Sequence, residues 1–438
     1  MLKRLYRILI VGICAIAGLA IAAVLYLNFY FNRLEVTNLF VDFSSFILLV
    51  FLLILITRYT LLLWFSYLQH IEAATDPAVE DYSPFVSIIV PAHNEAPVIQ
   101  AALQSLMDLE YEDFEAIVVD DGSTDETFQR ADRMTQQYGP ERIIVLRQPN
   151  AGKAAALNRG IAAARGELVL CMDADSRLEP QTVRLMVQHF ADSRVGAVAG
   201  NVKVANRLNF LTRLQALEYI EGLNLLRTAQ AFFRMTTVIP GPVGMFRRTI
   251  LQKLGGYRSD TFAEDCELTL RLVLSGYKVK YESSAVAWTE APETTDALFK
   301  QRYRWTRGIL QAIIKHRRQL AHPWREFMNW VFMALLVFES VAMPAMNVFG
   351  MIFFTCAAIW GGLSQLLLLW WAQLAILDII VALFCVAMEE EQISLVLYAL
   401  PYRLFFVTYV DVMRFFAGLD ETFAVEMVWG RLQRAGRI

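Results

Sequence analysis

The sequence of 438 residues has few cysteines and histidines, and neither type is arranged for metal binding. The five histidines show no ligand spacing, and the five cysteines lie far apart with no C-x-x-C pair. These absences argue against a zinc site and against a framework of disulfides. The cysteines are Cys14, Cys171, Cys266, Cys356 and Cys385.

The common phosphate-binding loops are also missing. The chain has neither G-x-x-x-x-G-K-[ST] nor a G-x-G-x-x-G that follows a strand, which argues against a P-loop NTPase and a dinucleotide-dependent dehydrogenase. The formal net charge is only -3, and no basic stripe is interleaved with aromatic residues. Nucleic acid is therefore not an expected partner.

Apolar residues, by contrast, make up 56% of the chain, which is too many for an ordinary soluble protein. They concentrate before about residue 68 and after about residue 325, and the segment between has a mixed composition. The distribution predicts a soluble domain inserted between two membrane-embedded regions.

Two N-terminal apolar runs, 8–30 and 41–66, are long enough to cross about 30 Å of hydrocarbon at about 1.5 Å per residue. They predict two transmembrane helices within residues 1–68. A signal peptide is the alternative for the first run, but that run is long and lacks a small-residue cleavage site. Basic residues before it place the N-terminus in the cytoplasm, so two crossings return the chain there.

The C-terminal apolar region, residues 324–418, predicts three or four transmembrane helices. Four are favoured, because only an even number places the acidic run 389–391 outside and the basic tail, residues 419–438, in the cytoplasm. The separate apolar stretches lie near 326–343, 345–361, 364–387 and 393–417.

The central segment, residues 83–297, alternates short β-branched runs with helical patterns. This alternation predicts a doubly wound α/β fold with a parallel sheet, which binds ligands beyond the carboxyl ends of its strands. The expected strands are 86–90, 115–119, 142–146 and 167–171, and the expected helices are 95–107, 123–137 and 152–165.

Acidic residues follow two of these strands. The first cluster, residues 120–125, is also compatible with a turn and a helix cap. In the second, Asp173 and Asp175 would repel each other unless a positive group lay between them, and a divalent cation is the natural partner. Lys153 begins a predicted helix and could reach diphosphate oxygens, although a lone lysine is often only solvated surface.

Six motifs in order resemble the family 2 glycosyltransferases with the GT-A fold. The similarity covers about residues 84 to 310, and Q-x-x-R-W is typical of the processive members that make cellulose, chitin, hyaluronan and poly-N-acetylglucosamine. In size and layout the chain is most similar to the bacterial poly-β-1,6-N-acetylglucosamine synthases. The motifs are residues 90–95 (VPAHNE), 119–125 (VDDGSTD), 152–153 (GK), 173–175 (DAD), 263–265 (AED) and 301–305 (QRYRW).

The resemblance implies a donor site for a UDP-sugar. In it Glu95 and Asp121 border the nucleoside pocket, and Lys153 meets the diphosphate. Asp173 and Asp175 hold the sugar diphosphate and its Mg²⁺ or Mn²⁺.

The resemblance also implies that Asp265, with Glu264 beside it, is the catalytic base. A carboxylate about 3 Å from the acceptor hydroxyl can take its proton, and a metal can offset charge on the leaving UDP. A single displacement of this kind inverts an α-linked donor to a β-linked product. The alternative for this acidic pair is a cap for the helix that follows.

Gln301, Arg304 and Trp305 share one face of a predicted interfacial helix, residues 298–323. Gln301 and Arg304 suit the donor phosphates, and Trp305 suits the apolar face of the terminal acceptor sugar. The alternative, which is compatible with the first, is an amphipathic helix on anionic lipid. Its cations would be Lys300, Arg302, Arg307 and Lys315.

Gly241 and Pro242 precede a short apolar segment where relatives shape the acceptor pocket, although an ordinary loop is compatible with the same residues. Three departures argue against cellulose: Ala263 replaces Thr, no PilZ-like domain follows, and no F-x-V-T-x-K segment is present.

The expected protein is a processive inverting glycosyltransferase of the bacterial inner membrane, with its catalytic domain in the cytoplasm. It would polymerise UDP-N-acetylglucosamine into a β-linked exopolysaccharide and translocate the growing chain. A small membrane partner and cyclic di-GMP regulation are implied by the resemblance alone. The alternatives are another UDP-sugar, a single addition to a lipid carrier, and an inactive nucleotide-sugar-binding subunit of an export channel.

Overall fold

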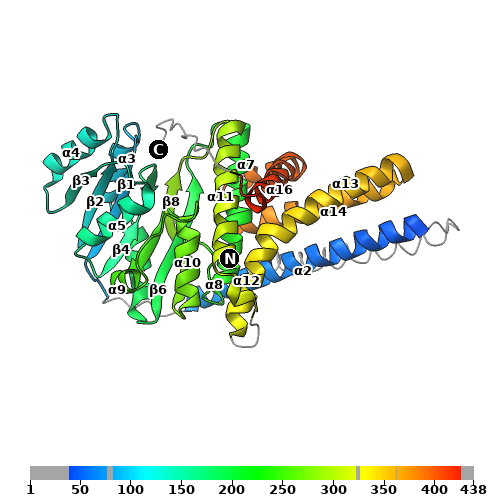
Figure 1. Ribbon diagram of the computed structural model, residues 1–438, viewed down its shortest axis with the longest axis horizontal. Coiled ribbons are helices and arrows are strands. Elements are labelled where there is room, and N and C mark those ends of the chain that lie inside the picture. The colour runs from blue at the N-terminus through cyan, green and yellow to red at the C-terminus, as the bar shows by residue number, and fades with distance from the viewer. Residues whose placement is uncertain (1–38, 76–81, 322–325, 362, 426–438) are drawn as a thin grey trace.

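The computed structural model describes residues 39–75, 82–321, 326–361 and 363–425. An α/β domain forms one end of the molecule, and long helices extend away from it at the other end (Figure 1). The first predicted transmembrane run and most of the basic tail lie outside the described residues.

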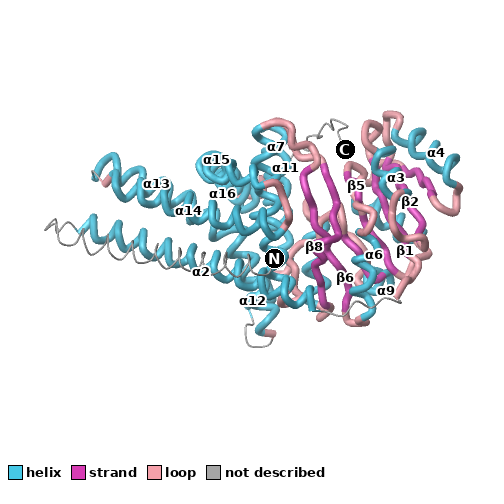
Figure 2. The backbone as a smooth tube through the Cα atoms, turned by 180° about the vertical axis from the view of Figure 1, so that it is seen from behind, coloured by secondary structure: helices cyan, strands magenta, loops and turns pink. Residues whose placement is uncertain are grey.

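An eight-stranded sheet forms the centre of the domain, in the order β3-β2-β1-β4-β7-β6-β8-β5. Helices cover its faces (Figure 2). The strands are β1 (Val86–Ala92), β2 (Phe114–Asp121), β3 (Ile143–Gln148), β4 (Leu168–Cys171), β5 (Ser176–Leu178), β6 (Val195–Val204), β7 (Gly244–Arg247) and β8 (Lys278–Thr289).

The first four strands confirm the doubly wound prediction, because β3, β2, β1 and β4 pair in parallel. Most of their side chains are apolar, because helices cover both faces of a parallel sheet. The parallel arrangement brings the ends of β1, β2 and β4 to one edge. The connecting helices are α3 (Ile99–Met107), α4 (Thr127–Tyr138) and α5 (Lys153–Ala163).

The expectation of a wholly parallel sheet was wrong for the other half. Strand β7 pairs antiparallel with both β4 and β6, and β5 pairs antiparallel with β8. The cause is the long excursion through three helices before β7, which returns the chain to the sheet from the opposite end. Gly244 at the start of β7 therefore lies opposite Cys171 at the end of β4, and this places the loop before Gly244 beside the D-x-D segment.

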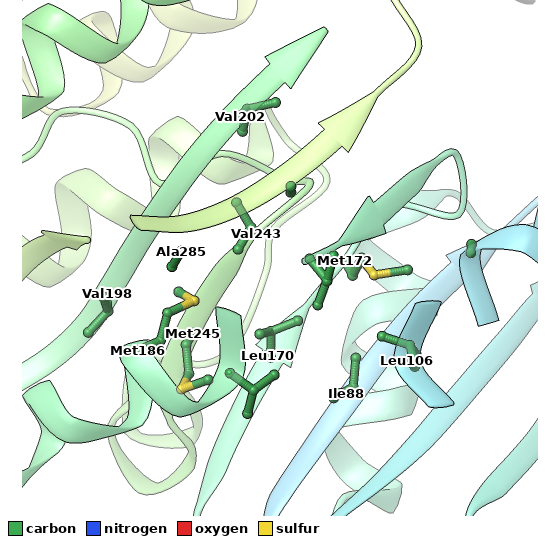
Figure 3. Close-up of a cluster of buried hydrophobic side chains, with 14 of the residues drawn as sticks. Ile88, Leu106, Leu170, Met172, Met186, Val198, Val202, Val243, Met245 and Ala285 are labelled. Carbon is green, nitrogen blue, oxygen red and sulfur yellow. The ribbon is translucent and has the colours of Figure 1, made fainter. Parts of the chain in front are cut away.

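The main core fills one side of the sheet, where Ile88, Leu170 and Met245 from adjacent strands are fully buried (Figure 3). Close packing of this kind makes the carboxyl ends of the strands a rigid support for polar loops. The other helices of the domain are α6 (Thr182–Gln188), η1 (His189–Ala191), α9 (Arg248–Lys253) and α10 (Glu264–Leu274).

Four long apolar helical stretches in the described part of the chain meet the length and composition needed to cross a membrane. One precedes the domain and three follow it. They are Val41–Ala73, Phe327–Ile359, Ser364–Met388 and Ile393–Thr422. Helix α2 (Leu39–Thr75) contains the first, and α14 (Ser364–Met388) is the third.

The number of membrane crossings after the domain stays a prediction, but the first two of the four expected stretches form one continuous helix. It consists of α12 (Phe327–Val337), a π turn η4 (Phe338–Ala342) and α13 (Met343–Gly361). The turn widens the helix just before Pro344, whose ring would otherwise clash with the carbonyl of the preceding turn. Pro344 therefore does not end the helix.

Several helices lie where the domain meets these long helices. In Figure 1, α7 and α11 stand upright, whereas α2, α13 and α14 run sideways away from the domain. Q-x-x-R-W thus lies on α11 at this junction, and the interfacial position of that helix at a membrane stays a prediction. The junction helices are α7 (Phe210–Glu218), η2 (Tyr219–Asn224), α8 (Leu225–Ala231), α11 (Thr295–Lys315), η3 (Arg317–Ala321), η5 (Ile393–Tyr398), α15 (Ala399–Pro401), η6 (Tyr402–Val407) and α16 (Thr408–Thr422).

Candidate active site

The loops that follow β1 and β2 brace each other at the edge of the sheet. His93 Nδ1 lies 2.8 Å from the carbonyl of Asp121, and the side-chain oxygen of Asn94 accepts a hydrogen bond from the Thr124 amide at 2.8 Å. Asn94 has a left-handed φ of 58°, a conformation that asparagine tolerates better than most residues. The two motifs therefore form one shaped wall.

The Asp121 carboxylate holds the next loop in place. It accepts hydrogen bonds from the amides of Ala151 at 2.9 Å and Gly152 at 2.8 Å, and from Gln148 Nε2 at 2.7 Å. These bonds fix the start of α5, whose first residue is Lys153. Asp121 thus supports the loop, and its predicted contact with a nucleoside stays a prediction, as does that of Glu95 on the opposite loop.

The Lys153 ammonium joins the D-x-D segment to the A-E-D segment. Its Nζ lies 2.5 Å from an Asp173 oxygen and 3.6 Å from a Glu264 oxygen. Burial lowers the pKa of Lys153, but the two carboxylates more than offset this and raise it above its ordinary value. The lysine is therefore charged at neutral pH, with a specific place between two acidic motifs.

The Gly241 backbone closes the third side of this group. A Cβ on Gly241 would lie 2.9 Å from both Asp173 Oδ2 and Lys153 Nζ, so no side chain fits here without displacing them. The structure thus brings Gly241 and Pro242 to the D-x-D segment, as the antiparallel pairing of β7 requires.

Asp265 lies in the first turn of α10, beside Glu264. Burial, together with the charge of Glu264, raises the pKa of Asp265 to about 6, although Lys153 and Arg304 act in the opposite direction. A carboxylate with a pKa near 6 is a better proton acceptor than an ordinary aspartate and is still ionised at neutral pH. Its Oδ1 also accepts a 2.8 Å hydrogen bond from the Cys266 amide. This bond to the neighbouring backbone fixes the orientation of the Asp265 carboxylate.

The residues present fit a hard divalent cation. The Asp173 side chain is 25% exposed beside Lys153 and Gly241, and Asp175 is buried with the Ser176 hydroxyl 3.4 Å from its Oδ1. Within the described residues, no three His, Cys, Asp or Glu side chains form a protein-only metal cage. Mg²⁺ and Mn²⁺ need no such cage, because one or two carboxylates, phosphate oxygens and waters complete their coordination.

The Q-x-x-R-W residues are not equally exposed. Gln301 is buried, and its side-chain oxygen accepts a hydrogen bond from Arg302 at 2.7 Å. Arg304 acts electrostatically on Asp265, which connects this helix to the A-E-D segment. Trp305 packs partly against the core and is covered by the Arg302 guanidinium 4.1 Å from its ring centroid.

Arg302 was interpreted from the sequence as a cation for anionic lipid, and this was wrong. Its side chain is only 2% exposed and forms a 2.5 Å ion pair with Glu218. Arg307 pairs with Glu421 at 2.7 Å. No sequence signal linked these partners, because each acidic residue lies far away in the chain. Arg302 and Arg307 instead fasten α11 to neighbouring parts of the protein.

A cleft lined by Trp305 lies between the junction helices and the long helices. Its lining includes the polar and charged side chains of Glu218, Glu221 and Arg227, together with Asn347 on α13. Sequence analysis did not predict Glu218, Glu221 or Arg227 as site residues, because they belong to no recognisable motif.

Comparison with known proteins identifies the class. Residues 87–255 match the family model described as "Glycosyl transferase family 2". This segment is a family 2 glycosyltransferase domain with the GT-A α/β fold, and the predicted resemblance is confirmed.

Curated proteins with similar sequences indicate the kind of glycosyltransferase that this chain resembles. The chain is 31% identical over 231 residues to poly-beta-1,6-N-acetyl-D-glucosamine synthase of Staphylococcus aureus strain COL, covering 52% of this chain and 56% of that protein. It is 35% identical over 245 residues to the probable glycosyltransferase YdaM of Bacillus subtilis strain 168, covering 54% and 58%. The chain thus spans little more than half the length of the curated relatives it matches.

A solved structure supports the fold. The mannosyltransferase PcManGT from Pyrobaculum calidifontis, determined in complex with GDP-Man and Mn²⁺, superposes with a TM-score of 0.63 at 23% identity. The match covers 86% of this chain and 100% of that one. At this identity the likeness establishes the architecture alone.

Proposed function

We propose that this protein is a processive, inverting, metal-dependent glycosyltransferase that polymerises a UDP-sugar into a β-linked polysaccharide and passes the product through the membrane. The observation that carries the proposal is the convergence of Lys153, Asp173, Glu264 and Asp265 close to a cleft lined by Trp305 and Arg227. The similarity to a poly-N-acetylglucosamine synthase favours UDP-N-acetylglucosamine as the donor.

The donor end of the site consists of one basic side chain, Lys153, next to the carboxylates of Asp173 and Glu264. Lys153 is charged and 38% exposed, so it can exchange its contact with Asp173 for diphosphate oxygens. Asp173 and Asp175 would hold the Mg²⁺ or Mn²⁺ that, when bound, supplies positive charge opposite the leaving diphosphate. Glu95 and Asp121 are proposed to border the nucleoside on the wall formed by the first two loops.

The acceptor end is built around Asp265. Its carboxylate accepts the proton of the acceptor hydroxyl while that oxygen forms a bond to the anomeric carbon, and the bond from this carbon to UDP breaks. One carboxylate acting in one displacement inverts the anomeric configuration. Gly241 and Pro242 leave the backbone close enough to contact a sugar.

Beyond the bond-forming step, the product needs a path. Trp305, which lines the cleft, is proposed to stack on the terminal sugar, and Arg304 with Gln301 is proposed to serve the donor. The cleft lies between the junction helices and the long helices, and its lining combines apolar side chains with the charged and polar groups of Glu218, Glu221 and Arg227, which can hydrogen-bond to sugar hydroxyls. We place the protein in the bacterial plasma membrane with the domain in the cytoplasm. A small membrane partner and cyclic di-GMP control are proposed from the resemblance alone.

The decisive experiment supplies the purified full-length protein, in lipid vesicles with Mg²⁺, with a panel of radiolabelled UDP-sugars. A long product that linkage-specific glycosidases degrade is expected from UDP-N-acetylglucosamine. A polymer made only from another UDP-sugar would correct the donor. A single-sugar lipid would refute processivity, and an absence of UDP release from every donor would refute enzymatic activity.

A further inference from the structure

The acidic turn after α14 docks on the catalytic domain. Glu389 accepts a hydrogen bond from Asn201 at 2.5 Å and lies 3.5 Å from Lys203 Nζ, both on β6. Glu391 pairs with Arg207 at 2.5 Å and with Lys203 at 3.3 Å. Both carboxylates are largely buried, with side chains 11% and 7% exposed. The turn is therefore fixed to the domain by a compact network of charges.

The segment that starts at this turn also ends on the domain side. Asp420 accepts a 2.6 Å hydrogen bond from the Tyr303 hydroxyl, and Glu421 pairs with Arg307 at 2.7 Å. Gln311 donates a further hydrogen bond to Glu421 at 3.2 Å. All three partners of these acids lie on α11, which carries Q-x-x-R-W. Residues 389–422, which we name the C-terminal strap, thus have both ends attached to the domain or its junction helix.

Between its ends, the strap runs beside α11. The Tyr409 hydroxyl bonds to the Thr295 carbonyl, and Glu421 bonds to Arg307, with the same separation of 114 residues at each contact. A constant separation means that α16 and α11 lie parallel, side by side. In Figure 1, α11 stands across the direction of α2, α13 and α14, and α16 lies against it. The strap therefore follows α11, and its middle is held against the long helices by Asn347 of α13, which donates to Asp411 at 2.6 Å, and by Asp378 of α14, which pairs with Arg403.

The strap has two different faces. Side chains at helical spacing are buried against the protein: Leu395, Ala399, Tyr402, Phe406, Val410 and Met413. Large apolar side chains between them are exposed: Ile393, Leu397, Leu400, Phe405, Phe416 and Leu419.

An exposed apolar face of this length suits the boundary between lipid headgroups and acyl chains. We infer that lipid, and not a protein partner, covers this exposed face. The neighbouring helices α13 and α14 would hold the strap at the membrane surface.

We propose that the C-terminal strap lies along the membrane surface on the side of the catalytic domain, although its length and composition would allow it to cross. Crossing about 30 Å of hydrocarbon would separate its ends, which is incompatible with domain-side contacts at both. The chain then crosses only twice after the domain, outward through α12 and α13 and back through α14. The acidic run, expected outside from the sequence, is placed on the domain side instead.

This inference takes from the proposed function only that α2, α13 and α14 are embedded in a membrane. The test uses single cysteines in the full chain, with its five native cysteines replaced by alanine, and a membrane-impermeant maleimide on sealed vesicles of both orientations. Gln392→Cys and Thr422→Cys report the two ends of the strap at exposed positions. Glu112→Cys marks the domain side, and Gln365→Cys marks the turn between α13 and α14.

Gln392→Cys and Thr422→Cys are expected to be labelled in the same vesicles as Glu112→Cys, with Gln365→Cys labelled only in the opposite ones. Labelling of Thr422→Cys with Gln365→Cys would mean a third crossing, and labelling of Gln392→Cys with Gln365→Cys would place the acidic turn outside. Either result overturns the proposal. If the cysteine-free chain is unstable, the same positions are measured above the background of the native chain. Glycosyl transfer does not enter the readout, so an inactive protein leaves the test valid.

Discussion

The acid inactivation of transfer should be governed by Asp265, whose pKa is raised to about 6 by burial and by Glu264. A general base acts only in its ionised form, so activity is present above this pKa and is lost as the pH falls through it. At pH 5, one unit below, about one tenth of the base is ionised, and kcat/KM should be about tenfold below its plateau. Initial rates of UDP release between about pH 5 and pH 8, measured at low donor concentration, give the acidic limb of the pH profile of kcat/KM.

Neighbouring charges should move the limb in opposite directions. Glu264→Gln removes a negative charge that raises the pKa of Asp265, so the limb should move to lower pH. Lys153→Met removes a positive charge that lowers it, so the limb should move to higher pH. Glu112→Gln, an exposed change elsewhere on the domain, should leave the limb in place.

Substitution of the base itself separates chemistry from binding. Asp265→Asn should reduce turnover by about 10²- to 10⁴-fold, the contribution typical of a general base. UDP binding should remain nearly intact, because the base acts on the acceptor. Turnover by Asp265→Asn within about tenfold of the native protein, or a limb that neither charge change moves, would refute the assignment.

Three further changes test other parts of the site. Asp175→Ala should weaken UDP binding in Mg²⁺ but not in EDTA, and equal UDP affinity of the native protein with and without metal would contradict a metal site. Gly241→Ala places a Cβ 2.9 Å from both Lys153 Nζ and Asp173 Oδ2, which must then shift, so the donor KM should rise; an unchanged KM would refute this. Arg302→Met leaves the buried Glu218 carboxylate without its ion-pair partner. The free energy of unfolding, measured by thermal unfolding, should fall by about 3–5 kcal/mol, and adding Glu218→Gln should largely restore it.

Local signals predicted the donor half of the domain well. Strands β1 to β4 are short, apolar and β-branched, and loops with acidic residues follow them, so their positions and their meeting at one edge follow from periodicity and parallel pairing. The approach of Gly241 to Asp173 follows from antiparallel pairing of β7 with β4, and no local pattern predicts that pairing. The motif order suggested the proximity only through the family resemblance.

The membrane region was harder to predict, because apolar composition does not distinguish a helix that crosses lipid from one that lies on it. That distinction depends on long-range ion pairs such as Glu391 with Arg207 and Glu421 with Arg307, whose partners lie more than a hundred residues away. The burial of Arg302 was missed for the same reason. Apolar composition also does not show that the helix continues through Pro344, which follows a π turn.

Lys153 couples donor binding to the strength of the base. In the free protein it contacts Asp173 and lowers the pKa of Asp265. The diphosphate of a bound UDP-sugar and a divalent cation carry nearly offsetting charges, so the remaining change is the movement of Lys153 toward phosphate oxygens and away from Asp265. The base should then become stronger when the donor is present. The acidic limb of kcat, which reports the donor complex, is expected at higher pH than that of kcat/KM, which reports the free enzyme. Coincident limbs, or the reverse order, would contradict this coupling.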